Sequence, residues 1–247
     1  MIITLTTDFG TADSYVAQMK GVILGIAKDA RIVDITHEVA PQDIIGGAFV
    51  LSQAVGAFPR GTVHVAVVDP GVGGSRAPVV IETDEYLLVG PNNGVLSLAA
   101  PVYRAAYRIE NPVFRRRHAS ATFEGRDVFA PAAAQLAAGA LPHEAGPPLD
   151  EFIGVEWHEP LGDIGEVIAI DRFGNLITNF RAEHAHGARS VRLGDIDAPL
   201  VRTFGEVDRG APLAYLGSSG FIELGLREGS AAARTGARRG VAVRVQR

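Results

Sequence analysis

The chain of 247 residues contains no cysteine. This absence excludes disulfide bonds, thiolate zinc sites, iron–sulfur clusters and a cysteine nucleophile. Long apolar runs are also missing, since no stretch approaches the ~18 residues of a membrane span. Residues 1–5 lack the basic region of a signal peptide and have the pattern of a first strand. We therefore expect a soluble, cytoplasmic protein that does not bind membranes.

The chain has fewer basic than acidic residues. The chain has 23 Lys and Arg against 28 Asp and Glu, a net charge of −5, which disfavours a nucleic-acid partner. Residues 1–159 carry a net charge of −7 and residues 160–247 a net charge of +2, which indicates two units that could face each other. Hydrophobic residues make up 47% and charged residues 21%, and this globular mix excludes disordered and coiled-coil chains.

Strand and helix patterns alternate over the first 155 residues. Asp13 or Ser14 is placed to cap a first helix and Asp43 a second. Residues 130–138 predict a third helix, in which Pro131 fits only the first turn. Strands are expected at residues 2–6, 31–35, 62–68, 79–82 and 86–89.

The pattern changes near residue 160 to short strands separated by turns, with no long helix. These strands are expected at residues 167–170, 176–180, 190–193, 212–216, 221–224 and 241–245. Residues 146–162 have the composition of a linker. We therefore predict a Rossmann-like α/β domain over residues 1–158, followed by a smaller all-β barrel domain over residues 163–247.

Acidic residues follow two of the predicted strands. Asp8 and Asp69 both stand at strand carboxyl ends, where open α/β sheets bind ligands. Asp8 and Asp13 could bind ribose hydroxyls or a cationic group, or Asp13 could be only a helix cap. Asp69 and Arg76 bracket a glycine-rich loop and could hold a water or an anion, or form a structural salt bridge. The residues alone leave these alternatives open.

Other motifs carry less information. The loop at residues 71–76 lacks both the Gly-Lys-Ser/Thr ending and the third glycine of dinucleotide sites, which disfavours ATP hydrolysis and NAD binding. His184 and His186 would share one face of a strand, but no third ligand is evident, so we expect an exposed loop and no metal site. His37 and His64 have no partner visible from spacing. A Gly-x-Ser-x-Gly elbow is absent, which removes the α/β-hydrolase nucleophile.

Seven ordered segments carry a resemblance to a known family. They are residues 6–10, 14–21, 34–37, 61–73, 90–94, 123–131 and 171–179. Together they resemble the S-adenosyl-L-methionine (SAM) hydroxide adenosyltransferases, also called adenosine-forming SAM hydrolases. That family is related to the SAM-dependent fluorinase and chlorinase.

The resemblance implies an N-terminal α/β domain and a C-terminal β-barrel. It also implies a homotrimer that binds SAM between the N-domain of one subunit and the C-domain of the next. Water or hydroxide then attacks the ribose C5′ of SAM, L-methionine leaves, and adenosine forms. SAM is the substrate, and no cofactor or metal is expected, because a sulfonium is already a good leaving group. Catalysis requires an oriented, poorly hydrated nucleophile in line with the C5′–S bond.

The resemblance also implies roles for single residues. Asp69 and Arg76 match the pair that positions and polarises the water in the hydrolases, Asp8 the ribose contact, and Asp13 a carboxylate near the methionine ammonium. The further substrate contacts implied are Phe123 near the site, Asp171 and Asn175 for the methionine amine and adenine, Phe204 stacking on adenine, and Ser218 for the methionine carboxylate.

Glu124 departs from the family pattern, which usually has histidine there, so the expected catalytic set is Asp69, Arg76 and Glu124. Glu124 could accept a hydrogen bond from water or pair with Arg76, and a second carboxylate beside Asp69 could slow hydrolysis or change its pH optimum. Alternatively, it turns outward and caps the following helix.

Two other functions stay open. A SAM-dependent halogenase would form 5′-halo-5′-deoxyadenosine, but the halogenases have tyrosine at the position of Asp69 and no arginine at that of Arg76. A catalytically weak SAM- or adenosine-binding protein is the second alternative, and Glu124 is the feature that keeps it open.

Overall fold

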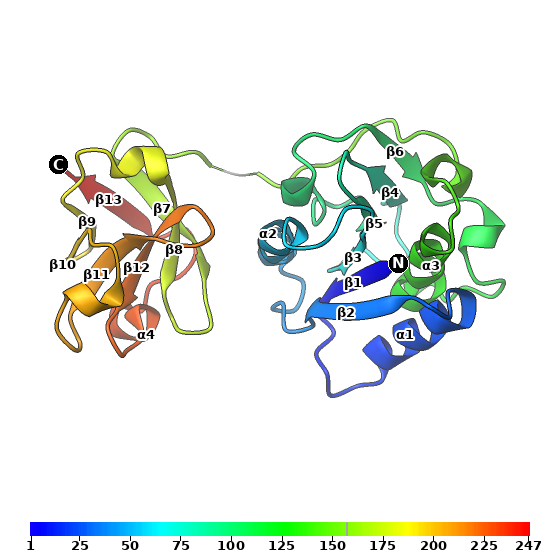
Figure 1. The fold of residues 1–247 in the computed structure, drawn as a ribbon, viewed down its shortest axis with the longest axis horizontal. Coiled ribbons are helices and arrows are strands. Elements are labelled where there is room, and N and C mark those ends of the chain that lie inside the picture. The colour runs from blue at the N-terminus through cyan, green and yellow to red at the C-terminus, as the bar shows by residue number, and fades with distance from the viewer. Residues whose placement is uncertain (157) are drawn as a thin grey trace. The chain divides into compact units, whose positions relative to one another are not determined.

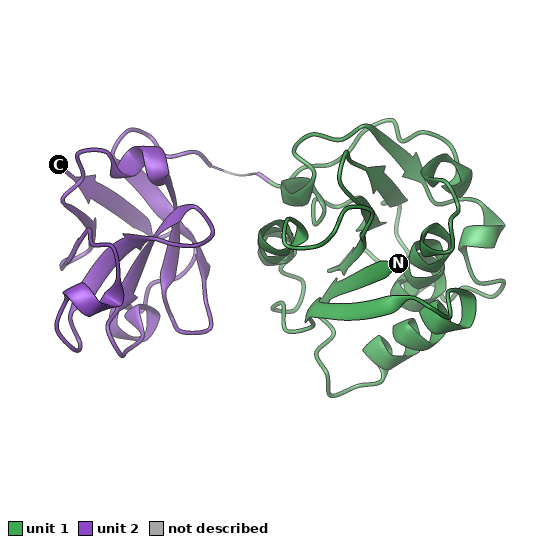
Figure 2. Ribbon diagram, in the orientation of Figure 1, with its two compact units in different colours: residues 1–155 green, residues 156–247 purple. Residues whose placement is uncertain are grey.

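The computed structural model describes residues 1–156 and 158–247 of the chain. Its contacts divide the protein into two compact units, residues 1–155 and residues 156–247 (Figures 1 and 2). The sequence places the domain boundary at residues 158–163, a few positions further along. Within the described residues, no helix is both long and apolar enough to cross a membrane.

Unit 1 is built on a six-stranded sheet with the order β2-β1-β3-β5-β4-β6. Strands β2, β1, β3 and β5 run parallel, and β4 is antiparallel to both of its neighbours. The strands are β1 (Ile2–Thr7), β2 (Arg31–Thr36), β3 (Val63–Val67), β4 (Pro78–Glu82), β5 (Leu87–Pro91) and β6 (Ala105–Arg108). The sequence predicts five of these strands and misses β6, a four-residue strand that follows no turn signal.

Helices cover both faces of this sheet (Figure 1). Helices α1 (Tyr15–Ile26) and α3 (Ala130–Ala137) pack on one face, and α2 (Ile44–Val55) packs on the other. In β3, Val65 and Val67 enter the first core, whereas Ala66 and the following Val68 enter the second. Burial on both sides explains why β3 is a continuous apolar run rather than an alternating one. The predicted α/β class of the first domain is confirmed.

The two predicted helix caps differ in outcome. The Asp43 carboxylate accepts a hydrogen bond from Gly46 N at 3.0 Å, as predicted for the start of α2. Ser14 is the N-cap residue of α1, but its side chain caps no backbone amide and instead accepts from the Gln18 side chain. Its backbone lies at φ −80°, ψ 1°, outside the extended conformation that capping hydroxyls prefer. The predicted side-chain cap of the first helix is therefore wrong.

The first half of the predicted linker belongs to unit 1. Arg108 N donates to Pro147 O, and Leu149 N donates to Ala106 O, so this segment pairs with the outer edge of β6. The Asn92 side chain fixes the following residues by accepting from Ile153 N at 2.9 Å. Backbone groups at a sheet edge need partners, and residues 147–149 supply them for β6. Residues 147–155 of the predicted linker therefore pack on unit 1, within the predicted bounds of the first domain, and position 157 lies outside the described residues.

Unit 2 is a seven-stranded antiparallel sheet with the order β10-β9-β13-β7-β8-β12-β11. Leu200, directly after β10, pairs with Ala214 of β11 and so joins the two outer strands into a barrel. The only α-helix in the described part of this unit is the five-residue α4 (Ala231–Thr235). The strands are β7 (Ile164–Ile170), β8 (Leu176–Arg181), β9 (Ser190–Leu193), β10 (Ile196–Pro199), β11 (Pro212–Leu216), β12 (Phe221–Leu226) and β13 (Ala242–Gln246).

The predicted all-β class of the second domain is confirmed, with two local differences. The short strand β10 is missing from the sequence prediction because it follows β9 after only two residues. His184 lies in a 3-10 turn, where its Nδ1 accepts from Arg181 N at 3.0 Å, and His186 follows that turn. No strand presents the two histidines on one face.

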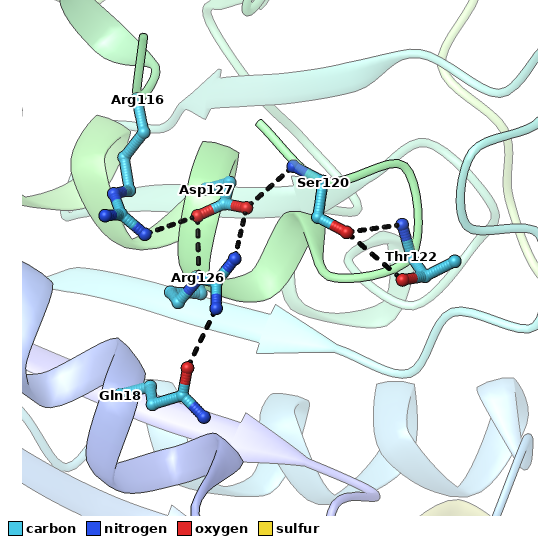
Figure 3. A network of polar contacts seen from close by, with 6 residues as sticks. All are labelled: Gln18, Arg116, Ser120, Thr122, Arg126 and Asp127. Atoms are coloured by element: carbon cyan, nitrogen blue, oxygen red, sulfur yellow. Dashed lines mark hydrogen bonds and ion pairs between the residues drawn. The ribbon is translucent and has the colours of Figure 1, made fainter. Parts of the chain in front are cut away.

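A buried carboxylate organises the segment that precedes α3 (Figure 3). Asp127 is fully buried and receives hydrogen bonds from Arg126 at 2.7 Å, Arg116 at 2.9 Å and Ser120 N at 2.8 Å. Arg126 also donates to Gln18 of α1 at 2.8 Å. Burial alone would raise the pKa of Asp127, but these partners lower it to about 2. The network ties residues 116–127 to α1.

Replacing Asp127 by Asn should destabilise unit 1 while leaving its shape intact. The amide cannot balance two arginines, so we expect a loss of about 2 kcal/mol in unfolding free energy at pH 7. Asp150→Asn is the matched control, because Asp150 pairs with Arg108 but is 87% exposed, and it should cost less than about 0.5 kcal/mol. Denaturant unfolding followed by circular dichroism measures both. Equal losses would show that the network contributes no more than a surface ion pair.

The sheet of unit 1 also buries a histidine. His64 of β3 is completely buried, its Nδ1 lies 2.7 Å from Thr4 Oγ1, and the Phe58 and Tyr86 rings pack against it. Burial lowers the pKa of His64 from 6.5 to about 4. Between pH 6.5 and pH 4, the His64 imidazole therefore binds a proton in the unfolded chain but not in the folded chain.

This depressed pKa predicts acid sensitivity. Between pH 6.5 and pH 4 the unfolded state binds more protons, so stability must fall as the pH falls. Between pH 7 and pH 5, His64 should cost the wild-type chain about 2 kcal/mol. His64→Phe retains a ring but not the titrating group, so its unfolding free energy should fall less over the same range. Denaturant titrations give the unfolding free energy of both proteins at each pH. An equal decrease in the two proteins would contradict the prediction.

Candidate active site

The carboxyl ends of β1 and β3 open onto a pocket in unit 1. Phe9 follows β1, Asp69 follows β3, and the segment before α3 closes the opposite side. The cavity has a volume of about 150 Å³. Its walls are Phe9, Tyr15, Val67, Asp69, Val72, Thr122, Phe123, Glu124 and Gly125. This is the place where ligands bind in open α/β sheets.

An ionic cluster of three residues lies at this pocket. The Arg76 guanidinium binds the Asp69 carboxylate through two nitrogens, with Nε donating to Oδ1 at 3.0 Å and Nη2 to Oδ2. The same Nη2 lies 2.5 Å from Glu124 Oε2. The three side chains are 4%, 10% and 13% exposed for Asp69, Arg76 and Glu124. One cation therefore joins two carboxylates in a poorly hydrated place.

Electrostatics favour the charged form of Arg76. Burial would lower its pKa, but hydrogen bonds and charge from Asp69 and Glu124 outweigh burial and raise the pKa above its ordinary value. The Phe129 ring also lies 5.6 Å from the guanidinium carbon. The cluster joins two carboxyl groups to one guanidinium. Such a site offers hydrogen-bond acceptors to water.

A close backbone approach brings the two halves of the cluster together. Gly73 has φ +74°, and a Cβ there would lie 2.4 Å from Ala121 O, so the glycine loop packs directly on the segment before Glu124. Glu124 occupies the N-cap position of the π-helical turn Gly125–Phe129, but its side chain caps no amide. The alternative that Glu124 points outward as a cap is therefore wrong.

Aromatic rings form the remaining wall. Phe123, expected from the sequence, packs edge-on against Tyr15 at 5.1 Å and Phe9 at 5.9 Å between ring centroids. Gly125 lies beneath these rings, where a Cβ would approach Phe9 and Phe123 to 3.3 Å. The sequence prediction omits Phe9 and Tyr15, although both stand within the segments that carry the family resemblance.

The two acidic residues of the loop after β1 lie outside the lining of this pocket. Asp8 is half-buried, and its Oδ2 accepts from Gln42 N at 2.8 Å. Asp13 is exposed on the loop before α1. The structure therefore brings Asp69, Arg76, Glu124 and Phe123 together and leaves Asp8 and Asp13 outside the pocket lining, on the loop between β1 and α1.

Three of the four predicted residues of unit 2, Asp171, Asn175 and Phe204, form a second cluster. The Asp171 carboxylate accepts from Asn175 N and from Asn175 Nδ2, both at 2.8 Å, which fixes the turn between β7 and β8. Asn175 Oδ1 and the Phe204 ring both face Gly225, where an added Cβ would lie 2.9 Å from each. An amide and an aromatic ring above a bare backbone can hold a flat polar ring.

A tyrosine and a buried glutamate adjoin this second cluster. Tyr215 packs on Phe204 at 4.9 Å between centroids, and its hydroxyl donates to Glu223 at 2.6 Å. Burial and the Glu223 charge raise the pKa of Tyr215 above its ordinary value. Ser218 is exposed on the β11–β12 turn, and the neighbouring Ser219 contacts Glu223. The sequence prediction omits Tyr215 and Glu223, because in strand patterns they read as ordinary alternating positions.

Comparison with known proteins identifies the chain's relatives. Residues 3–146 match the SAM hydroxide adenosyltransferase N-terminal domain and residues 165–244 the C-terminal domain of the same name. A protein of Thermus thermophilus named (R)-S-adenosyl-L-methionine hydrolase is 41% identical over 250 residues, covering 97% of each chain. A fluorinase of Actinopolyspora mzabensis is 29% identical over 290 residues, covering 100% of this chain and 97% of that protein.

A solved structure is similar over the whole chain. The crystal structure of an uncharacterized conserved protein from Thermotoga maritima gives a TM-score of 0.94 at 35% identity, covering 100% of both chains. The two domain matches follow each other in order and together include both residue clusters described above. The chain therefore belongs to the SAM hydroxide adenosyltransferase family.

Proposed function

We propose that this chain hydrolyses SAM to adenosine and L-methionine. Family membership supports the proposal, as do four relatives, 38–41% identical over most of the chain, that are named (R)-S-adenosyl-L-methionine hydrolase. The observation that carries it in this chain is the Asp69–Arg76–Glu124 cluster at the pocket. It provides fixed acceptors that can orient a water in a mostly apolar cavity.

The proposed reaction is a direct displacement. A lone pair of a water oxygen forms the O–C5′ bond, the C5′–S bond breaks, and its electron pair stays on sulfur, which becomes the thioether of methionine. Asp69 and Glu124 accept hydrogen bonds from the water and take up its proton, which passes to solvent. Arg76 holds both carboxylates in place. The positive charge on sulfur disappears as the bond breaks, so the reaction requires no cofactor or metal.

The remaining residues are proposed as substrate contacts. Asp8 binds the ribose hydroxyls, Asp13 lies near the methionine ammonium, and Phe123 packs beside the reacting carbon. The contacts proposed in unit 2 are Asp171 and Asn175 for the methionine amine and adenine, Phe204 for stacking on adenine, and Ser218 for the methionine carboxylate. In support, Asn175 and Phe204 approach the same glycine, so an amide and an aromatic ring are available to a planar base at one place.

We further propose that the protein is a cytoplasmic homotrimer whose sites lie at subunit interfaces. The groups proposed for one substrate belong to two compact units, with the nucleophile-binding cluster in unit 1 and the adenine cluster in unit 2. The excess negative charge of the first part and the excess positive charge of the second favour such an arrangement.

Incubating the full chain with SAM in ¹⁸O-labelled water tests the reaction. Because water supplies the new oxygen, we expect adenosine with one ¹⁸O at its 5′ position and unlabelled L-methionine, identified by chromatography and mass spectrometry. Both sulfonium epimers should be supplied, since the relatives' name specifies the (R) form. Asp69→Ala is the paired variant, and it should lower kcat by about 100-fold or more with little change in KM.

Parallel reactions with added chloride or fluoride separate the alternatives. A 5′-halo-5′-deoxyadenosine product would replace the proposal by the halogenase function. Calorimetric binding of SAM without turnover would replace it by the binding function. Equal losses in SAM affinity and turnover for Asp69→Ala would place Asp69 in binding rather than in chemistry.

Glu124→Gln tests whether Glu124, at the position where the family usually has histidine, takes part in the reaction. The amide retains the size of Glu124 but loses the charge that accepts a proton, so kcat should fall at least about tenfold with KM nearly unchanged. Glu124→His, which supplies a different proton acceptor, should retain activity with a shifted pH profile. Glu110→Gln, at an exposed position after β6, is the control. Wild-type kinetics in Glu124→Gln would remove Glu124 from the catalytic set.

A further inference from the structure

A chain of polar side chains leads from helix α1 to the end of β1. Lys20 Nζ lies 2.5 Å from Asp34 Oδ2, Asp34 Oδ1 lies 3.1 Å from His37 Nε2, and His37 Nδ1 lies 2.9 Å from Thr7 Oγ1. Lys20 belongs to α1, Asp34 to β2 and Thr7 to the last position of β1. This series of contacts therefore joins three elements and ends at Thr7, one residue before Asp8.

The inner contacts of this series are buried. Thr7 Oγ1 accepts from Phe9 N at 3.2 Å and lies 2.9 Å from His37 Nδ1. His37 Nε2 faces Asp34 Oδ1 at 3.1 Å. His37 is 5% exposed and Thr7 is fully buried, so no water replaces these contacts at the inner end. These contacts link Asp34 to Phe9 N through His37 and Thr7.

The same segment holds the loop after β1 at three further points. Gly10 N donates to His37 O at 2.7 Å, and Val39 N donates to Thr7 O at 3.4 Å. Beyond them, Gln42 N donates to the Asp8 carboxylate at 2.8 Å. The segment from His37 to Gln42 therefore contacts the backbone on both sides of Asp8 and the Asp8 side chain itself.

Ion pairing fixes the exposed end of this series of contacts, at Lys20 and Asp34. Burial alone would raise the pKa of Asp34, but Lys20 and His37 lower it below its ordinary value. Asp34 is therefore ionised throughout the neutral range. Loss of the Lys20 ammonium would leave this carboxylate with His37 alone, free to turn toward solvent, because the Asp34 side chain is 38% exposed.

We propose that Lys20, Asp34, His37 and Thr7 are positioning residues that fix Asp8 for the ribose of the substrate. This inference rests on the proposed function and assigns a role to four residues that lie outside the lining of the pocket. None of the four contacts the Asp69–Arg76–Glu124 cluster. Their loss therefore weakens ribose binding and leaves the displacement step intact.

Lys20→Met is the first test, because methionine preserves the length of the side chain and removes its charge. We expect KM for SAM to rise about 3- to 10-fold with kcat within about twofold of wild type. The chain has only one other lysine, Lys28, which is exposed just after α1, and Lys28→Met is the matched control with wild-type kinetics expected. Thr7→Val, which loses the hydroxyl that links Phe9 N to His37, should show the same KM increase.

A double-mutant cycle distinguishes positioning from a general loss of stability. If these four residues act through Asp8, then Lys20→Met should raise KM much less in an Asp8→Asn background than in wild type. The increase should also be smaller with the 2′-deoxyribose analogue of SAM than with SAM. Full additivity, or a fall in kcat at unchanged KM, would overturn the inference. Failure of the wild-type chain to hydrolyse SAM would instead overturn the proposed function, since these ratios require a working wild-type enzyme.

Discussion

The site of unit 1 depends on one cation held between two carboxylates. Arg76 neutralises Asp69 through a two-nitrogen contact and reaches Glu124 with the same Nη2. Without it, two nearly buried carboxylates would face each other unpaired, and one would have to bind a proton or move to solvent. The glycine loop, its contact with Ala121 and the network around Asp127 all serve to bring these three groups to one place.

Local chemistry explains which parts of the fold the sequence could predict. The buried run of β3, the Asp43 cap and the strand-end position of Asp69 follow from periodicity and residue type within a few positions. Strand β6 and the segment at residues 147–149 lack such signals, because β6 pairs with β4 more than 20 residues earlier and the segment pairs with β6 about 40 residues earlier. Strand β10 pairs with the adjacent β9, but it is only four residues long and includes Asp197 and Pro199.

The same distinction holds at the candidate site. Asp69 and Arg76 are seven positions apart, so the sequence indicates them as a pair around the glycine loop. His37 and its partner Thr7 are 30 positions apart, and no sequence pattern links them. The direction of the Glu124 side chain depends on how the π-helical turn meets the glycine loop, which only tertiary packing decides. Residue types thus indicated the chemistry, and the fold decided which groups meet.

The edges of the two sheets limit how this protein can associate with others. In unit 2, the pairing of Leu200 with Ala214 joins the outer strands, and in unit 1 the segment at residues 147–149 covers the edge of β6. Strand β2 forms the other edge of the unit 1 sheet, and it carries Arg31 and Asp34. Charged side chains on an edge discourage the addition of a foreign strand. Recognition by β-strand addition is therefore disfavoured at these edges, and contacts between copies should form through side chains and loops.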